Sequence, residues 1–324
     1  MRAIQVQRHG GPDVLELVDL PVRDPGAGEV RVRHHAIGLN FLDTYFRSGL
    51  YKVPLPLVPG SEGAGVVDAV GPGVAGFAVG DRVAYAASSP GSYAEQRTIE
   101  AAQLVHLPDA IAFDTAAAMM LKGLTVEYLL GRTSPQGGLH AGDTIVWHAA
   151  AGGVGLIAVQ WAKARGLRVI GTAGGPAKCA LAKAHGADEM IDYHREDVVA
   201  RVRELTGGNG VKIVFDSVGK DTFERSLDCL APFGLLVAFG NASGPVPPFD
   251  LLALSRKGSL YVTRPTLNTH TKAHLPEMAR ELFEVVTSGK VQIEIGQRFP
   301  LADAAKAHAA LEGRNTTGAS VLVP

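Results

Sequence analysis

The sequence predicts an α/β protein in which a doubly wound parallel sheet accompanies a separate, β-rich domain. Short apolar runs alternate with helix-length segments from about residue 143 onward. Before residue 120, short β-like segments are interrupted by glycine and proline instead. The chain has 324 residues, of which 46% are hydrophobic and 19% charged, so it is long enough for two globular domains.

The first 120 residues have the pattern of an antiparallel β-domain. Residues 30–34 alternate apolar and polar side chains, as a half-buried strand does. Residues 63–70 form a short apolar run that is followed by glycines at turn spacing, and residues 81–85 are expected to form a further strand. We therefore expect a compact, mostly antiparallel domain, with a partial barrel as one form it could take.

The second pattern is an alternation of strands and helices. The expected strands are residues 144–148, 168–171, 189–191, 211–215 and 235–239, and the expected helices are residues 154–165, 177–185 and 197–205. Such alternation requires right-handed crossovers and a parallel, doubly wound sheet. After it, a helix at residues 275–288 and a strand at residues 319–323 are expected to fold back on the N-terminal domain.

A glycine-rich turn joins the first of these strands to its helix. Ala150, Gly152 and Gly155 occupy the three small-residue positions of the dinucleotide-binding fingerprint. They permit, in that order, the tight turn, the close approach of a pyrophosphate and the packing of helix on strand. Gly153 and Val154 begin the helix, whose unpaired N–H groups attract phosphate. The alternative is a purely structural glycine turn, which the strand–turn–helix context disfavours.

The residues after the second strand indicate which nucleotide binds. An NAD enzyme carries an acidic residue there, about 20 residues past the glycine motif, to hold the ribose 2′-hydroxyl. Residues 171–178 contain no acid, and Lys178 could instead meet a 2′-phosphate, with Thr172 and the small residues leaving room. The predicted cofactor is therefore NADPH. On this reasoning alone, Lys178 could equally be a solvated lysine on a helix surface.

Charge and cysteine content argue against several classes of protein. The net charge is −1, from 31 basic and 32 acidic residues, so neither nucleic acid nor an anionic membrane is an expected partner. Cys179 and Cys229 are too few for a disulfide framework or a structural zinc lobe. The sequence has neither the pattern of a signal peptide nor a run of ~20 apolar residues. We therefore expect a cytoplasmic protein.

Longer segments, spread over nearly the whole chain, carry a family resemblance. They are residues 40–51, 59–65, 121–125, 148–155, 215–219, 226–230, 239–241 and 258–265. Together these segments resemble the zinc-free, zeta-crystallin-like quinone oxidoreductases of the medium-chain dehydrogenase/reductase superfamily, particularly the bacterial NADPH:quinone reductases.

The resemblance implies a domain organisation and a set of cofactor contacts. It implies a GroES-like catalytic domain from residues 1–124 and 266–324, a Rossmann NADPH-binding domain from residues 125–265, and usually a homodimer. The implied cofactor contacts are Asn40, Thr125, Gly152, Gly153, Lys178, Tyr193, Ser217, Phe239 with the adjacent Gly240 and Asn241, and Arg314. Lys178 and Tyr193 resemble the pair that surrounds the adenosine 2′-phosphate.

The positions that bind catalytic zinc in related alcohol dehydrogenases are changed in this chain. Asn40 stands where those enzymes have a cysteine, and Ser61 where they have the histidine of a Gly-His-Glu motif. Glu62 alone cannot complete a zinc shell and is interpreted as structural, and none of the 11 histidines has metal-ligand spacing. No metal is therefore predicted, and alcohol oxidation without a Lewis acid is disfavoured.

An acceptor that takes a hydride without zinc should itself be electrophilic. We therefore predict an enzyme that transfers a hydride from NADPH to a quinone or another conjugated carbonyl compound. Asn40, Tyr45 and Tyr51 are the candidate catalytic residues, because a tyrosine hydroxyl could donate to the substrate oxygen. Each tyrosine could equally be an ordinary half-buried aromatic residue. The alternatives are an NADPH-dependent alkenal or enone reductase and a nucleotide-binding protein with little turnover.

Overall fold

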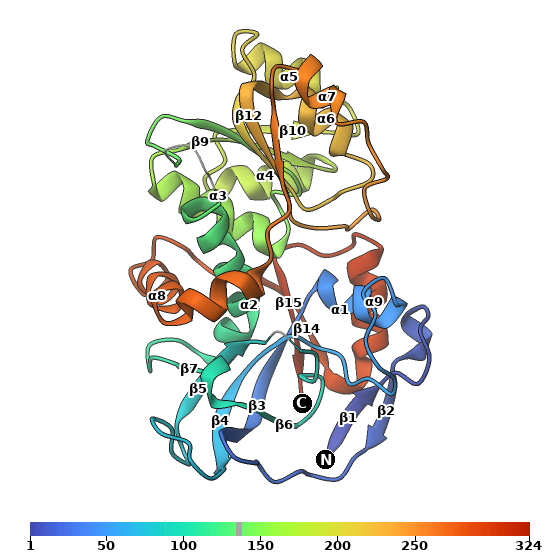
Figure 1. Ribbon diagram of the computed structural model, residues 1–324, viewed down its shortest axis with the longest axis vertical. Coiled ribbons are helices and arrows are strands. Elements are labelled where there is room, and N and C mark those ends of the chain that lie inside the picture. The colour runs from blue at the N-terminus through green and yellow to red at the C-terminus, as the bar shows by residue number, and fades with distance from the viewer. Residues whose placement is uncertain (88, 134–137) are drawn as a thin grey trace. The chain divides into compact units, whose positions relative to one another are not determined.

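The computed structural model describes residues 1–87, 89–133 and 138–324. The chain divides into two compact units, each formed by segments that are distant in sequence (Figure 1). The first unit comprises Met1–Leu124, His274–Thr287 and Ile293–Pro324, and the second comprises Thr125–Ala273 and Ser288–Gln292. None of the described helices is both long and apolar enough to span a bilayer.

A seven-stranded sheet organises the first unit. Its strands follow the order β14-β15-β3-β4-β5-β7, and β6 pairs with β3. The bounds are β3 (Glu29–Leu39), β4 (Glu62–Val70), β5 (Arg82–Ala86), β6 (Gln96–Glu100), β7 (Val105–His106), β14 (Ile295–Pro300) and β15 (Ala319–Val323). All pairs are antiparallel except β14 with β15. A separate antiparallel pair consists of β1 (Arg2–Gln5) and β2 (Glu16–Asp19). The predicted antiparallel β-domain is confirmed.

The C-terminal strand returns to the N-terminal part of the chain, as the sequence predicted. β15 pairs with β3, with Ser320 opposite Leu39, and in Figure 1 the red C-terminal strands lie beside the blue β3. Val32 of β3 packs with Val67 and Val83 of the next two strands in a buried apolar cluster. The alternating pattern of the sequence thus places one face of the sheet in a core.

Three helices of the first unit were not evident in the sequence. α1 (Phe41–Ser48) directly follows β3, and α9 (Ala304–Glu312) follows β14. α2 (Phe113–Gly131) passes from the first unit into the second. Residues 116–120 of α2 are all completely buried, so the helix has no apolar stripe by which a sequence pattern would reveal it. Short 3₁₀ helices occur at η1 (Pro12–Val14), η2 (Ala101–Gln103) and η3 (Leu301–Asp303).

The second unit is built on a six-stranded parallel sheet. The strand order is β10-β9-β8-β11-β12-β13, and every neighbouring pair is parallel. The bounds are β8 (Thr144–Trp147), β9 (Arg168–Ala173), β10 (Glu189–Asp192), β11 (Val211–Asp216), β12 (Leu230–Ala238) and β13 (Tyr261–Thr263). This is the order of the dinucleotide-binding fold, in which the ligand lies where the strand order reverses, here between β8 and β11. The five predicted strands are confirmed, and β13 adds a sixth.

Helices cover both faces of this sheet. They are α3 (Gly153–Ala164), α4 (Pro176–Ala184), α5 (Val198–Leu205), α6 (Phe223–Asp228) and α7 (Leu252–Arg256). Successive strand residues point to opposite faces, and Ile145 and Val146 of β8 are both completely buried. On one face Val146 packs with Val202 of α5 and Leu227 of α6. Burial on both faces explains why these strands read as continuous apolar runs.

The last long helix, α8 (Leu267–Thr287), is interrupted at His274, where φ is −139°. The part up to Ala273 belongs to the second unit, in which the ring of His270 stacks on Tyr128 of α2 with 4.5 Å between the ring centroids. The sequence placed the domain boundary at residue 266, whereas the second unit continues to Ala273 because this helical segment packs on α2.

Candidate functional site

The turn after β8 is bent sharply and tied to the neighbouring strand. Ala149 has a positive φ of 54°, and the N–H of Ala150 donates to the carbonyl of Thr172 at 3.0 Å. A Cβ at Gly171 would lie 2.5 Å from the Met190 sulfur and 2.8 Å from the Ala150 Cβ. The first fingerprint position is therefore small because β9 passes directly beneath it.

The two glycines that follow are required for different reasons. A Cβ at Gly155 would lie 2.4 Å from the carbonyl oxygen of Ala149, so this glycine is needed for the turn itself. A Cβ at Gly152 would approach the same oxygen only to 3.4 Å, an ordinary contact that the protein tolerates. The protein's own contacts therefore do not require a glycine at position 152, and the predicted approach of a pyrophosphate is a separate reason for its small size. Gly152 also precedes α3 without a side-chain cap, which leaves the helix end, beginning with Gly153 and Val154, to an anion.

Thr172 is part of a buried hydrogen-bond chain. The His148 ring lies 2.9 Å from the Thr172 hydroxyl through Nδ1 and 3.0 Å from the Ser226 hydroxyl through Nε2, and the Ser226 hydroxyl donates to Asp216 at 2.8 Å. Because both Asp216 and the Thr222 carbonyl are acceptors for the Ser226 proton, Nε2–H of a neutral His148 donates to Ser226 and the Thr172 hydroxyl donates to Nδ1. Burial lowers the pKa of His148, which agrees with a neutral ring. In this arrangement the Thr172 hydroxyl proton is directed at His148, and its predicted place among the cofactor contacts stays a prediction.

Lys178 and Tyr193 come from neighbouring elements, α4 and the segment after β10. Gly174, in the loop before α4, approaches Tyr193 so closely that a Cβ would lie 2.6 Å from the phenol oxygen. The ring of Tyr193 is 37% exposed and so offers an aromatic surface to a ligand. Asp192 lies beside this loop, but its carboxylate accepts the N–H groups of Gly175 and His194 at 2.8 and 3.1 Å. These backbone donors lower the pKa of Asp192 and occupy one of its oxygens.

The remaining predicted contacts of the second unit follow β11 and β12. Ser217 and Gly240 touch, since a Cβ at Gly240 would lie 2.3 Å from the Ser217 carbonyl oxygen. Phe239 and Asn241 flank Gly240, and Arg264 donates to the Gly240 carbonyl at 2.9 Å. The carboxyl ends of parallel strands meet at one edge of the sheet. The structure therefore brings the predicted contacts that follow β8, β9, β11 and β12 to a common edge.

In the first unit, Asn40 connects the end of β3 to the start of α1. Its N–H donates to Asp43 at 2.9 Å, and its side-chain amide donates to Glu62 at 2.8 Å. Glu62 is completely buried and also accepts the Lys122 ammonium at 2.6 Å and the Leu121 N–H at 2.7 Å. Asn40 is thus held through its backbone and its side chain by two buried carboxylates.

Asp43 leads from Asn40 into a second buried network. Its carboxylate accepts the hydroxyls of Ser61 at 2.9 Å and Tyr93 at 3.1 Å, and Tyr93 lies 3.0 Å from His308. Burial raises the pKa of Asp43 to about 7, although the donors from Ser61, Asn40 and Tyr93 oppose the shift. Burial, with Arg47 nearby, lowers the pKa of His308 to about 3. The network therefore contains one neutral histidine and one carboxyl that titrates near neutrality.

The other predicted residues lie on three elements. Tyr45 of α1 is buried, and its ring meets that of Tyr51 edge-on with 5.3 Å between centroids. Thr125 is buried on α2. Arg314 is exposed after α9 and adopts a positive φ of 57°. The structure thus pairs the two tyrosines beyond Asn40, while Thr125 belongs to the second unit and Arg314 to the first.

The residues at the zinc-ligand positions are engaged with protein groups. Ser61 donates to Asp43, and both oxygens of Glu62 accept protein donors. Among the described residues, no three His, Cys, Asp or Glu side chains are grouped as a metal ion would require. An amide, a hydroxyl and a lysine-paired carboxylate are also a donor set unlike that of zinc proteins.

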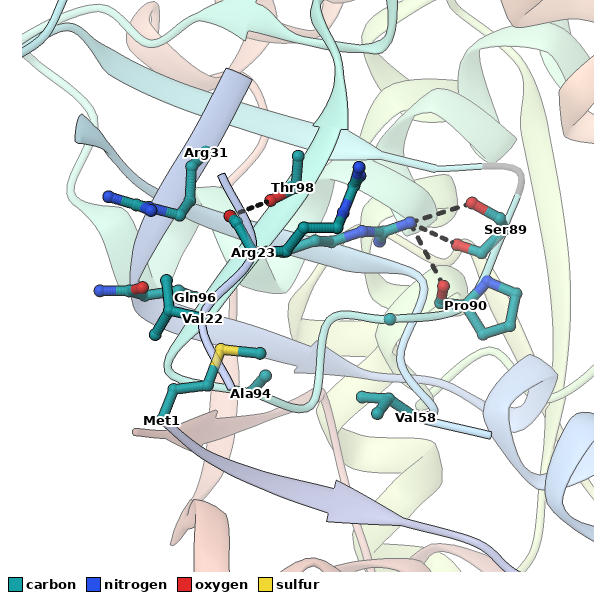
Figure 2. A pocket seen from close by; sticks show the side chains of 12 residues that line it. Met1, Val22, Arg23, Arg31, Val58, Ser89, Pro90, Ala94, Gln96 and Thr98 are labelled. Carbon is teal, nitrogen blue, oxygen red and sulfur yellow. Dashed lines mark hydrogen bonds between the residues drawn. The ribbon is translucent and has the colours of Figure 1, made fainter. Parts of the chain in front are cut away.

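A cavity of about 260 Å³ in the first unit lies apart from these predicted residues, none of which lines it (Figure 2). The guanidinium of Arg97 donates to the backbone and hydroxyl oxygens of Ser89 and to the hydroxyl of Ser92. Ser92 is hydrogen-bonded to Tyr85, and Tyr85 to His34. Burial lowers the pKa of His34 to about 4. We interpret these hydrogen bonds, which connect His34, Tyr85, Ser92 and Arg97 to Ser89, as structural contacts that hold Ser89 in place.

Comparison with known proteins identifies the family of this chain. Residues 26–109 match the family model of the alcohol dehydrogenase GroES-like domain, and residues 153–284 match that of the zinc-binding dehydrogenase. A quinone oxidoreductase of Pseudomonas aeruginosa is 58% identical, with 100% of this chain and 99% of the relative aligned. The chain belongs to the quinone oxidoreductase family.

Other similar proteins agree with this membership. The crystal structure of the Escherichia coli quinone oxidoreductase complexed with NADPH has a TM-score of 0.97 and 49% identity, and each chain is covered completely. A 2-haloacrylate reductase of a Burkholderia species is 42% identical over 99% of this chain and 98% of its own length. The family resemblance and the combination of GroES-like and Rossmann folds predicted from the sequence are confirmed.

Sequence reasoning did not identify several residues that organise the quinone oxidoreductase site. Lys122 was noted only within a family-like segment, and Asp43 and Arg264 were not singled out. Lys122 did leave a signal, because it is the one charged residue in the apolar run 116–126. A charge in such a run is either exposed or paired in the interior. The side-chain donors to Asp43 and the carbonyls that accept from Arg264 are distant in sequence, and only the bond from the Asn40 N–H to Asp43 is local.

Proposed function

We propose that this chain reduces quinones by hydride transfer from NADPH, without a metal ion. The observation that carries the proposal is the turn after β8, in which Gly152 is small although the protein itself would accept a side chain there. Full-length similarity to quinone oxidoreductases, one of them crystallised with NADPH, supports the choice of cofactor and acceptor.

The chain's own residues account for the binding of the nucleotide. The N-terminal end of α3 and the turn before it receive the pyrophosphate through backbone N–H groups. Lys178 supplies a positive charge for the 2′-phosphate, and the exposed ring of Tyr193 packs beside it. Asp192, whose Oδ1 accepts backbone N–H groups, does not offer that oxygen to a ribose hydroxyl. Ser217, Phe239, Gly240 and Asn241 line the same sheet edge, and Asn40, Thr125 and Arg314 complete the proposed contacts.

The quinone has to be positioned by protein groups and does not need activation by a metal ion. NADPH, when bound, supplies the hydride, and a quinone that takes up this hydride and one proton becomes a hydroquinone. Asn40 holds its amide in a fixed orientation, and Tyr45 or Tyr51 is proposed to donate a hydrogen bond to the oxygen that gains negative charge. Glu62 stays bound to Lys122 and takes no part as a metal ligand.

An NADPH-dependent enone reductase is the second candidate function. The 42% identity to a 2-haloacrylate reductase favours it, because an activated alkene can accept a hydride in the same way as a quinone. Steady-state kinetics with 1,4-benzoquinone, 1,4-naphthoquinone and small enones would separate the two candidates. We expect the highest kcat/KM for a quinone, with hydroquinone as the product. A higher kcat/KM for every enone would replace the quinone assignment.

We also propose that the protein is a homodimer in the cytoplasm. β13 is an edge strand on which Tyr261 is exposed, and Phe233, Leu251 and Leu252 of the same unit are more than half exposed. An open strand edge with apolar side chains nearby is a surface that a second copy could cover. Cys179 and Cys229 are free thiols, as expected in a reducing compartment. Analytical ultracentrifugation of the wild-type protein would test the dimer.

A further inference from the structure

The first unit contains an ion pair whose two members are removed from solvent. Glu62 is completely buried and Lys122 is only 5% exposed, and their charged atoms are 2.6 Å apart. Charges are seldom buried unless each has a partner, because the interior solvates them poorly. In the part of the chain that the structure describes, Lys122 is the one cation paired with Glu62.

The Glu62 carboxylate is held from three directions. Oε1 accepts both Asn40 and Lys122, and Oε2 accepts the N–H of Leu121. The backbone of Gly38 lies directly against this carboxylate, since a Cβ at Gly38 would be 2.2 Å from Oε1. The carboxylate therefore has no space to rotate on that side. The position of this carboxylate is therefore fixed by β3 and α2 together.

A fixed carboxylate determines how the Asn40 amide is oriented. An ionised carboxylate only accepts hydrogen bonds, so the amide must turn its NH₂ group toward Glu62. The backbone of Asn40 is fixed as well, because its N–H donates to Asp43. A backbone movement therefore cannot reorient the side-chain amide. The amide oxygen of Asn40 consequently faces away from Glu62 and toward the N–H of Asp43 in a capping box, which leaves its second lone pair as an acceptor of fixed direction.

We propose that Lys122 is a positioning residue, whose ammonium acts through Glu62 to hold the Asn40 amide oxygen toward a donor group of the nicotinamide nucleotide. A ribose hydroxyl and a carboxamide N–H are donors of the required kind. This inference rests on the proposed function, in which Asn40 contacts NADPH.

Among the residues that the structure describes, no second cation is paired with Glu62. Asp43, Tyr85 and Tyr93 also sense the charge of Glu62, which raises the pKa of each of them. The raised pKa values keep the hydroxyls of Tyr85 and Tyr93 neutral, so only Asp43, when ionised, adds to the negative charge that Lys122 balances. Without Lys122, Glu62 loses one of the donors that hold its carboxylate in place, and the Asn40 amide becomes free to turn over.

The test is a double-mutant cycle with Lys122→Met and Asn40→Ala, read by fluorescence titration with NADPH and by kcat/KM for 1,4-benzoquinone. We expect each single variant to bind NADPH about 10-fold more weakly, and the double variant to bind no more weakly than Asn40→Ala. If Lys122→Met weakens binding by the same factor in the Asn40→Ala background, Lys122 does not act through Asn40 and the inference is wrong.

A second variant separates positioning from folding. Lys122→Met/Glu62→Gln removes both charges, so its Tm should recover most of the roughly 5 °C or more lost by Lys122→Met. Its NADPH affinity should stay low, since a glutamine amide donates and accepts and no longer sets one orientation for Asn40. Wild-type NADPH affinity in this variant would show that the pair is only structural.

Arg132→Met provides the matched control on the same helix. Arg132 pairs with the buried Glu127 of α2, so this variant should lower the Tm and leave NADPH affinity unchanged. An equal loss of affinity would assign the effect to helix stability and overturn the inference. A wild-type protein that binds NADPH but reduces no quinone would contradict the proposed function alone, because the affinity cycle still tests Lys122.

Discussion

The two candidate regions of this protein differ in the chemical groups that they offer to a ligand. In the second unit, the turn at residues 149–155 is made of alanine, glycine and valine, and it offers backbone N–H groups and an open helix end. In the first unit, Asn40 is surrounded by buried charged groups, among them Asp43, Glu62 and Lys122. A backbone site keeps its polarity at any pH, whereas a buried charged site depends on which groups are ionised. Ligand binding at the turn should therefore depend on the size of its side chains, and ligand binding at Asn40 should depend on the charges of the neighbouring groups.

The strongest test of the shape-dependent region compares its two glycines. Gly155→Ala should abolish measurable NADPH binding, a loss of more than about 100-fold, and should lower the Tm, because the added Cβ meets the turn itself. Gly152→Ala should weaken NADPH binding by about 10-fold or more and leave the Tm unchanged, since only the ligand meets the new methyl group. Fluorescence titration and thermal unfolding measure the two effects. An unchanged NADPH affinity in Gly152→Ala would show that the phosphates do not bind at this turn.

The pH dependence of unfolding tests the buried charged groups of the first unit. The pKa of His34 falls to about 4 in the folded protein, against about 6.5 in the unfolded chain. The unfolded chain therefore binds the proton first, so stability is full above pH ~6.5 and falls by about 1.4 kcal/mol per unit toward pH 4. Asp43 acts in the opposite sense, because its raised pKa favours folding at low pH and the gain is lost as pH rises through about 7.

His34→Gln isolates one of these contributions. The variant should lose stability less steeply than the wild type between pH 6.5 and 4, by about 1 kcal/mol per pH unit, in urea denaturation series. Its loss of stability at pH 7 is a separate effect, caused by the weaker hydrogen bonds to Tyr85 and Ala94. Parallel pH profiles for the two proteins would mean that His34 is not kept neutral by the fold.

Lys178→Glu tests charge recognition within the otherwise backbone-based region. We expect the KM for NADPH to rise about 30-fold while that for NADH changes little, because a carboxylate repels the 2′-phosphate. Steady-state kinetics with both nucleotides measure the ratio. Equal effects on NADPH and NADH would exclude Lys178 from this role.

The smallest expected effect concerns the tyrosines beside Asn40. Tyr45→Phe or Tyr51→Phe should lower kcat for quinone reduction by about 10-fold in the variant that loses the donor, with an unchanged KM for NADPH. The two rings pack edge-on, which phenylalanine preserves. Unchanged turnover in both variants would mean that solvent supplies the proton.

The difference between the two regions also explains what the sequence could predict. The nucleotide turn and the five parallel strands were identified because a glycine motif and short apolar runs are local patterns. The hydrogen bond from Lys122 to Glu62 instead joins residues 60 positions apart, and the bond between Arg47 and His308 spans 261 positions. Contacts between such distant side chains leave no spacing in the sequence, so the network around Asn40 became visible only in the structure.

Two further differences have physical causes of the same kind. α2 was missed because burial on all sides removes the amphipathic pattern that reveals a surface helix. Thr172 was predicted to leave room for the cofactor beside Lys178, and the sequence did not reveal that its hydroxyl is hydrogen-bonded to the buried His148, 24 positions away. Which of the remaining predicted residues touch NADPH is still a prediction that the variants above test.

Oxidation of NADPH at 340 nm by the purified protein, with 1,4-benzoquinone as acceptor and EDTA present, tests the central claim most directly. NADH is measured in parallel as the control for the role of the 2′-phosphate. The account predicts turnover that EDTA does not reduce and that is markedly faster with NADPH at low nucleotide concentration. Turnover that EDTA abolishes and Zn²⁺ restores would contradict the metal-free site built around Glu62 and Lys122.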